Sequence, residues 1–159
     1  MSKDALKNLA PHHIGISVRS IDEAIAFWSD MFGFELDFRT EIPAIRAEIA
    51  FIKRNGFRIE LFQIEGAAEV PQERLKPNTD LATHGTKHIC FSVDDVQGAL
   101  EHLHGRGVRI VGIMRQHGAP MQVEEDPRLS GYKVPARAFF FLDASNTLVE
   151  ILRKSDFSD

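Results

Sequence analysis

The sequence predicts an α+β fold made of two tandem βαβββ modules, which form a cupped, mixed β-sheet with the helices on its outside. The motif HHIGISV at residues 12–18 returns as KHICFSV at residues 87–93. Each copy is followed by apolar residues at helical spacing, and each module closes on a strand with a central glutamate, IEL at 59–61 and VEI at 149–151. A repeat of this length indicates two fused copies of one supersecondary unit rather than a solenoid.

The first module is expected at residues 11–64, after an N-terminal extension at 1–10. Alternation of branched and small residues predicts a strand at 13–18. Ser20 and Glu23 form a capping box, so a helix is expected to run from there to about Phe32 and to end at Gly33. Strands are expected near 34–40, 45–53 and 57–63, and Asn55-Gly56 is typical of a hairpin turn between the last two.

The second module is expected at residues 87–154, after a connector at 65–86 and before a tail at 155–159. A strand at 88–93 leads into a helix that Asp94 or Asp95 caps and that ends near Gly105. Further strands are expected at 108–114, 138–142 and 147–152. The excursion at 115–137 has no counterpart in the first module and no periodicity of its own, which favours a functional segment such as a lid.

Composition excludes several classes of function. The chain has 159 residues and a net charge of -4, and its basic residues are scattered, so a nucleic-acid partner is not expected. It contains no apolar stretch long enough for a membrane span and no signal peptide, so we expect a cytoplasmic protein without membrane contact. The single cysteine, Cys90, lies in an apolar run and is expected to be a buried structural thiol.

Four side chains form a candidate metal site. Strand alternation places His13 and His88 on the face opposite the branched residues of their strands. The same alternation places Glu60 and Glu150 on that face, each between apolar neighbours that point to the helix side. A carboxylate at the centre of an apolar strand needs a partner. A single histidine of this kind is more often a packing residue, but a His and a Glu in both repeats favour a divalent ion with nitrogen and oxygen ligands.

The motifs HHIGISV, IELF, HICFSVDD and VEIL resemble the vicinal oxygen chelate superfamily from about residue 12 to residue 152. This superfamily includes glyoxalase I, methylmalonyl-CoA epimerase, extradiol dioxygenases and bleomycin-resistance proteins. The resemblance implies that His13, Glu60, His88 and Glu150 bind one divalent ion (Zn, Ni, Co, Mn or Fe), reached by a small-molecule substrate with adjacent oxygens. It also implies a homodimer, with the site formed within one chain or across two. His12 is expected to point away from the metal.

The resemblance is closest to the epimerases and glyoxalase-like lyases. It implies a metal-dependent lyase or isomerase in which the metal polarises a carbonyl and a base transfers a proton through an enediolate of a small acyl or hydroxy-keto substrate. Glu150 is the first candidate base and Glu60 the second, with Glu41 or Glu48 as a partner acid. Glutathione-binding members usually carry Arg and Asn at the positions that here hold Ser17 and Ile64, which argues against glutathione.

Two alternatives are open. An Fe(II) extradiol-type dioxygenase would use His13, His88 and Glu150 as a facial triad, with Glu60 in excess. A non-catalytic protein that sequesters a small molecule such as an antibiotic would need an apolar cleft, although Trp28 lies on the core-facing stripe of its helix and is better explained by packing. Four polar residues of the excursion could contact a substrate if the segment closes as a lid: Arg115, His117, Tyr132 and Lys133.

Overall fold

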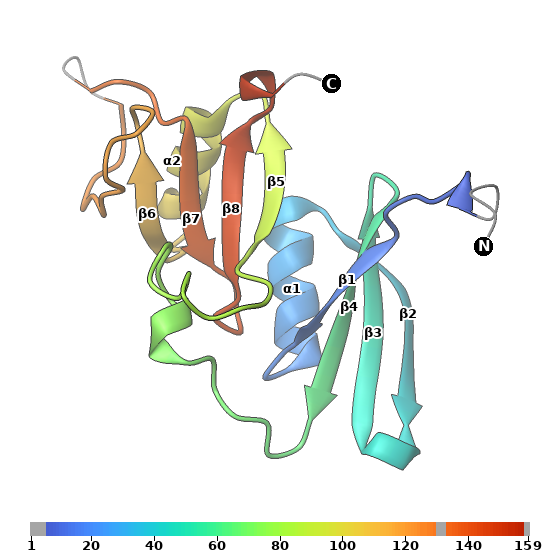
Figure 1. Cartoon of the computed structure of the whole chain (residues 1–159). Coiled ribbons are helices and arrows are strands. Elements are labelled where there is room, and N and C mark those ends of the chain that lie inside the picture. The colour runs from blue at the N-terminus through green and yellow to red at the C-terminus, as the bar shows by residue number, and fades with distance from the viewer. Residues whose placement is uncertain (1–5, 130–132, 158–159) are drawn as a thin grey trace. The chain divides into compact units, whose positions relative to one another are not determined.

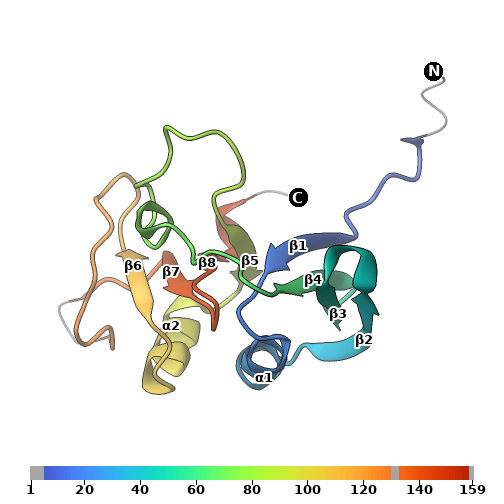
Figure 2. The same ribbon diagram turned by 90° about the horizontal axis from the view of Figure 1, so that it is seen from below.

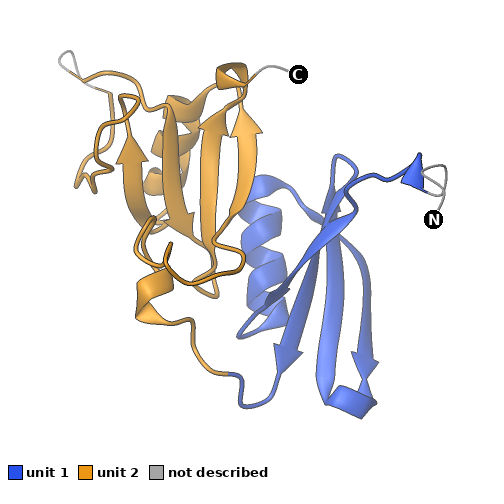
Figure 3. Cartoon of the chain, in the orientation of Figure 1, with its two compact units in different colours: residues 1–67 blue, residues 68–159 orange. Residues whose placement is uncertain are grey.

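A computed structural model of the chain describes residues 6–129 and 133–157. The chain divides into two compact units, Met1–Ala67 and Ala68–Asp159 (Figure 3). Each unit contains one α-helix and one mixed four-stranded sheet in the order βαβββ, which confirms the predicted modules (Figure 1). The strands thus form two sheets, one in each unit, rather than a single hydrogen-bonded sheet. No helix of the described segments has the length and apolar character needed to cross a membrane.

The first unit has the strand order β1-β4-β3-β2. Its elements are β1 (His13–Ser17), α1 (Ile21–Phe32), β2 (Glu35–Ile42), a short 3-10 helix η2 (Pro43–Ile45), β3 (Ala47–Arg54) and β4 (Phe57–Ile64). Strand β1 is parallel to β4, and the other pairs are antiparallel. The parallel pair places the start of the module beside its end, and this brings His13 close to Glu60 in space.

The second unit repeats this arrangement with the strand order β5-β8-β7-β6. Its elements are η3 (Gln72–Arg74), β5 (Ile89–Val93), α2 (Val96–Gly105), β6 (Ile110–Met114), β7 (Ala138–Leu142), β8 (Leu148–Arg153) and η4 (Lys154–Asp156). Strand β5 is again parallel to β8, with Cys90 opposite Glu150 where β1 has Gly15 opposite Glu60. The two modules therefore share their strand pairing as well as their sequence motifs.

The helix ends confirm the sequence signals. The Ser20 hydroxyl accepts a hydrogen bond of 3.3 Å from the Glu23 amide, and Gly33 ends α1 in the left-handed region at φ 63°. Between the two candidates for the second cap, the structure selects Asp95, whose side chain accepts from the Gly98 amide at 2.9 Å. Both caps satisfy amides that would lack an intrahelical partner.

Each helix covers one face of its own sheet (Figure 2). In the first unit Trp28 is fully buried on the sheet-facing side of α1, as the helical spacing predicts, and it packs edge-on against Phe34 with ring centroids 5.4 Å apart. In the second unit Leu100 of α2 and Phe139 and Phe141 of β7 are fully buried. The opposite face of each sheet is the one that carries the histidine and glutamate of the repeat.

The connector at residues 65–86 contributes to the core of the second unit. It enters the second unit, and Leu75 is buried with Phe140, Leu142 and Leu148 on the sheet face opposite α2. Figure 2 shows this segment, in green, on the side of β7 and β8 away from α2. Part of a segment expected to be a link is therefore a component of the second unit's core.

Candidate metal centre

The first candidate pair is His13 and Glu60. His13 begins β1, and Glu60 lies at the centre of β4 between the fully buried Ile59 and Leu61. The imidazole Nε2 lies 3.2 Å from the Glu60 Oε2, and the two side chains are 36% and 19% exposed. The structure therefore brings together the two residues that the sequence predicts for the first module.

The second pair, His88 and Glu150, repeats this geometry. His88 directly precedes β5, and Glu150 lies in β8 between the buried Val149 and Ile151. Nε2 of His88 lies 2.9 Å from Oε2 of Glu150, and the side chains are 34% and 18% exposed. The nitrogen–oxygen distances and the side-chain exposures agree closely between the two pairs, as expected if both pairs have the same role.

A phenylalanine completes each pair, and sequence reasoning missed it. The Phe51 ring of β3 lies opposite Glu60 in the ladder and edge-on to His13, with centroids 5.3 Å apart. Phe140 of β7 lies opposite Glu150 and edge-on to His88 at 5.2 Å. An aromatic wall fixes the imidazole plane and excludes water from one side of it, so each module presents a preformed His–Phe–Glu group.

The donor set of each pair suits a divalent metal. Two ligands that sit about 2.1 Å from an ion at roughly a right angle lie about 3 Å apart, which is close to both observed nitrogen–oxygen distances. Such a distance also suits a hydrogen bond between imidazole and carboxylate. Within either unit, the described residues assemble no group of three or more His, Cys, Asp or Glu side chains that could hold a metal. Each pair offers one nitrogen and one oxygen donor.

Cys90 is a correction to the sequence analysis. It lies opposite Glu150 in the ladder, and it is exposed rather than buried, because the position equivalent to Gly15 is on the open face of the sheet. Partial desolvation of the thiol and the neighbouring Glu150 carboxylate raise the pKa of Cys90 to about 12. The thiol is therefore a poor nucleophile at neutral pH.

His12 is a second correction. Strand alternation predicts that it points away from His13, but β1 begins only at His13, so the alternation does not extend to it. Instead the His12 ring is edge-on to the His13 ring, with the two Nδ1 atoms 2.7 Å apart. This contact involves Nδ1 of His13 and leaves its Nε2 directed at Glu60. His12 therefore contacts the other ring nitrogen of the candidate ligand.

The structure does not bring Glu41 or Glu48 to the His13–Glu60 pair. The two carboxylates are directly opposite each other in β2 and β3, and Glu48 is three residues from Phe51, the ladder partner of Glu60. An odd separation along a strand places side chains on opposite faces. Glu48 accordingly binds Arg39, which also reaches Asp22 of α1 at 2.6 Å on the helix side.

The described parts of the excursion are tied together by side-chain hydrogen bonds. The Arg115 guanidinium binds Glu124 through Nε at 2.6 Å and Nη2 at 2.8 Å, and its other donors reach Gln97 and two loop carbonyls. Lys133 also binds Glu124, at 3.2 Å. Arg115 thus links the segment to α2, and Lys133 binds within the segment, to Glu124 and the Asp126 carbonyl. Tyr132 lies outside the described residues. Pairing of Ile113 with Gln122 further covers the edge of β6.

Comparisons with known proteins show the family of the chain. The family model of the Glyoxalase/Bleomycin resistance protein/Dioxygenase superfamily matches residues 10–136. An ethylmalonyl-CoA/methylmalonyl-CoA epimerase of Cereibacter sphaeroides is 26% identical over 114 residues, which cover 69% of this chain and 83% of that protein. The mitochondrial methylmalonyl-CoA epimerase of Bos taurus is 24% identical over 108 residues, covering 68% of this chain. The match spans only 60% of the bovine protein's length.

Solved structures show the same fold. The trypanothione-dependent glyoxalase I of Leishmania major superposes with a TM-score of 0.62 at 16% identity, covering 92% of this chain and 88% of that one. The match to the family model extends over most of the chain and includes three members of the two His–Glu pairs, His13, Glu60 and His88. The chain therefore belongs to the Glyoxalase/Bleomycin resistance protein/Dioxygenase superfamily.

Proposed function

We propose that the protein is a divalent-metal-dependent isomerase or lyase of the glyoxalase-like type that moves a proton between adjacent carbons of a small acyl or hydroxy-keto substrate. One observation supports this most strongly, the repetition of the His–Phe–Glu group with nitrogen–oxygen distances of 3.2 Å and 2.9 Å. A packing role would not require the same three residue types, register and ring geometry in both modules.

In this proposal His13, Glu60, His88 and Glu150 hold one metal ion, with Zn, Ni, Co, Mn and Fe all compatible with two nitrogen and two oxygen donors. The metal, when bound, would supply a Lewis acid that polarises a substrate carbonyl and favours its enediolate form. The ligands of one ion could come from one chain or from two chains of a homodimer.

The chain's own residues have separate tasks. Glu150 is the proposed base, because its carboxylate lies on the open face of β8 beside Cys90 and is 18% exposed. Glu60 is the second candidate, with 19% exposure. Neither Glu41 nor Glu48 is given a role, since both lie on the helix face of their sheet. Phe51 and Phe140 would keep water from one side of the proton being moved.

The epimerase relatives suggest a first substrate to test, methylmalonyl-CoA. The protein would be incubated with it in D2O, and deuterium incorporation at the carbon between the two carbonyls would be followed by NMR. We expect incorporation by the metal-loaded protein, and a loss of at least about 100-fold in Glu150→Gln, the scale of general-base catalysis. The matched control Glu41→Gln, on the other face, should retain the wild-type rate.

Other outcomes would favour the alternatives. Cleavage of a catechol by an iron-containing protein would favour the dioxygenase. A protein that carries no metal, exchanges no protons and binds a drug stoichiometrically would favour the sequestering module. Absence of deuterium incorporation with methylmalonyl-CoA but incorporation with another acyl or hydroxy-keto compound would change the substrate and keep the reaction type. Failure with every such compound, in a metal-loaded protein, would overturn the proposal.

A further inference from the structure

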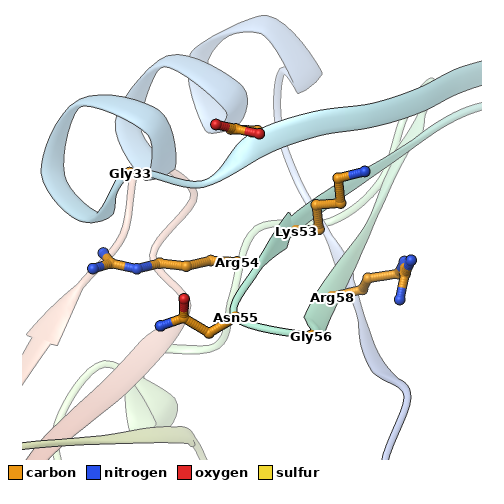
Figure 4. Close-up of a pocket in the computed structure, with 7 residues that line it drawn as sticks. Gly33, Lys53, Arg54, Asn55, Gly56 and Arg58 are labelled. Atoms are coloured by element: carbon orange, nitrogen blue, oxygen red, sulfur yellow. The ribbon is translucent and has the colours of Figure 1, made fainter.

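The first unit contains a pocket that the metal pairs do not occupy. It has a volume of about 450 Å³, within the usual range for small-molecule sites, and lies at the β3–β4 hairpin (Figure 4). Three of its lining residues are cationic, Lys53, Arg54 and Arg58, and one is anionic, Glu35. Figure 4 shows Lys53 and Arg58 on one side of the hairpin and Arg54 on the other.

Lys53 and Arg58 share a face with the His13–Glu60 pair. Arg58 is directly opposite His13 in the β1–β4 ladder, and Lys53 is opposite Arg58 in the β3–β4 ladder. Glu60 is two residues further along β4, so it points to the same side, about 7 Å away along the strand. A small molecule with oxygens at Glu60 could therefore extend to these two cations.

The two cations are held in place but keep free donors. Asp37 accepts from Lys53 Nζ at 2.6 Å and from Arg58 Nε at 2.9 Å, and these bonds hold the pKa of Asp37 below its usual value. Within the described part of the chain, Nη1 and Nη2 of Arg58 donate no hydrogen bond to the protein. All five N–H groups of Arg115, by contrast, have partners. Arg58 thus presents the edge of a guanidinium that binds phosphate or carboxylate in a bidentate manner.

In the second module, apolar side chains occupy the position that corresponds to the cationic pocket. Leu148 and Leu142 stand opposite each other in the β7–β8 ladder, where the first module has Arg58 and Lys53, and the connector residue Leu75 packs on them. The space that remains there, beside His88, measures only about 20 Å³. One copy of the duplicated fold is closed by the chain itself, whereas the other keeps an open, cationic pocket.

We propose that the hairpin pocket binds an anionic group of the substrate, a phosphate or a carboxylate, through Lys53 and the free guanidinium edge of Arg58. The site would select small molecules that carry this charge near the oxygens bound at Glu60. The inference rests on the proposed function only for the contact between the substrate oxygens and Glu60, because anion binding at Lys53 and Arg58 needs no metal.

The test is titration of the full-length, ¹⁵N-labelled protein by NMR with inorganic phosphate and, separately, with succinate. We expect saturable shifts concentrated at Gly33 and residues 53–58 with at least one of the two anions. Arg58→Gln should weaken that binding at least about tenfold, the scale of a lost charge-assisted pair. Lys53→Gln is a second variant that tests the same pocket, and Arg128→Gln, an exposed arginine of the second unit, is the matched control.

Binding of phosphate alone would assign a phosphoryl group, and binding of succinate alone a carboxylate. Shifts scattered over the surface, or Arg58→Gln and Lys53→Gln with affinities within twofold of wild type, would overturn the inference. Elemental analysis of the same samples separates the two proposals. If the protein binds an anion but holds no metal, the anion site is supported and the proposed function is overturned. If the protein holds metal but binds neither anion, the anion site is overturned and the proposed function stands.

Discussion

Replacing Arg115 with Met should loosen the excursion at 115–137 and destabilise the second unit. Arg115 extends from the end of β6 and binds the Glu124 carboxylate with two N–H groups, at 2.6 Å and 2.8 Å. It also donates to Gln97 of α2 at 3.0 Å and to the carbonyls of Val134 and Pro127. Methionine replaces the apolar stem of the side chain and removes all of these donors.

The magnitude follows from burial. The Arg115 and Glu124 side chains are 14% and 17% exposed, between an exposed ion pair, worth less than about 1 kcal/mol, and a buried one, whose disruption costs about 3–5 kcal/mol. Gln97 keeps its bond from the Ala136 amide at 2.9 Å, and water can reach the exposed Val134 carbonyl. We therefore expect a loss of about 2–3 kcal/mol, which for a protein of this size lowers Tm by about 4–12 °C.

Thermal unfolding followed by circular dichroism would measure this loss, and Arg128→Met is the matched control. Arg128 makes the same kind of bidentate contact with Asp126 in the same excursion, but its side chain is 75% exposed, so its loss should change Tm much less than the loss of Arg115. Hydrogen exchange at the Ala136 amide should accelerate in Arg115→Met only. Equal Tm values for the two variants would refute the view that Arg115 anchors the excursion.

Three further predictions concern pH, a helix cap and the core. The hydrogen bonds from Arg115, and to a smaller extent from Lys133, keep the pKa of Glu124 below 4.5 in the folded protein. The contribution of the Glu124 carboxylate to the free energy of unfolding should therefore be complete above about pH 5 and disappear as pH falls below 4.5. The Tm difference between wild type and Glu124→Gln should therefore shrink on acidification, and a difference that is constant with pH would contradict this. Gly98→Ala should not give the gain of about 1 kcal/mol usual in helix interiors, because its Cβ would displace the Asp95 cap. Gly105→Ala, at the last residue of α2 and with open space around it, should give a gain of about 0.5 kcal/mol in a denaturant titration. Trp28→Ala should cost about 3–5 kcal/mol in the same titration, since the side chain is fully buried, and a loss below about 1 kcal/mol would show that the first unit's core is misplaced.

Most of the fold could be predicted from the sequence because its signals are local. The Ser20 cap, the Gly33 stop and the Asn55-Gly56 turn each act through a few neighbouring residues, and the structure confirms all of them. The two-residue turn also fixes the register of β3 on β4, so the ladder contact between Glu60 and Phe51 could have been found. The same register places Glu48 opposite Gln63, on the helix face, which excludes it as a partner acid for Glu60.

Other features depend on contacts that no local pattern encodes. The connection between β7 and β8 is a five-residue loop, residues 143–147, so the sequence leaves the pairing of Phe140 with Glu150 open. Arg115 holds the excursion through loop carbonyls and Gln97, groups with no periodicity to reveal them. His12 departs from alternation because the strand begins one residue later. Within each module the His–Glu pair can be predicted, because it follows from which strands are neighbours and from the alternation of side chains along a strand.

The most direct test of the account is the metal content of single-ligand variants. Wild type, Glu60→Gln, Glu150→Gln, His13→Ala and His88→Ala would be loaded with metal, desalted and measured by elemental analysis, with Glu41→Gln as the control. We predict one equivalent per chain in wild type and Glu41→Gln, and a loss of at least about tenfold in affinity in each of the four variants, whichever unit carries the substitution. Wild type without bound metal, or variants of one unit that leave binding unchanged, would contradict a single ion held by both pairs.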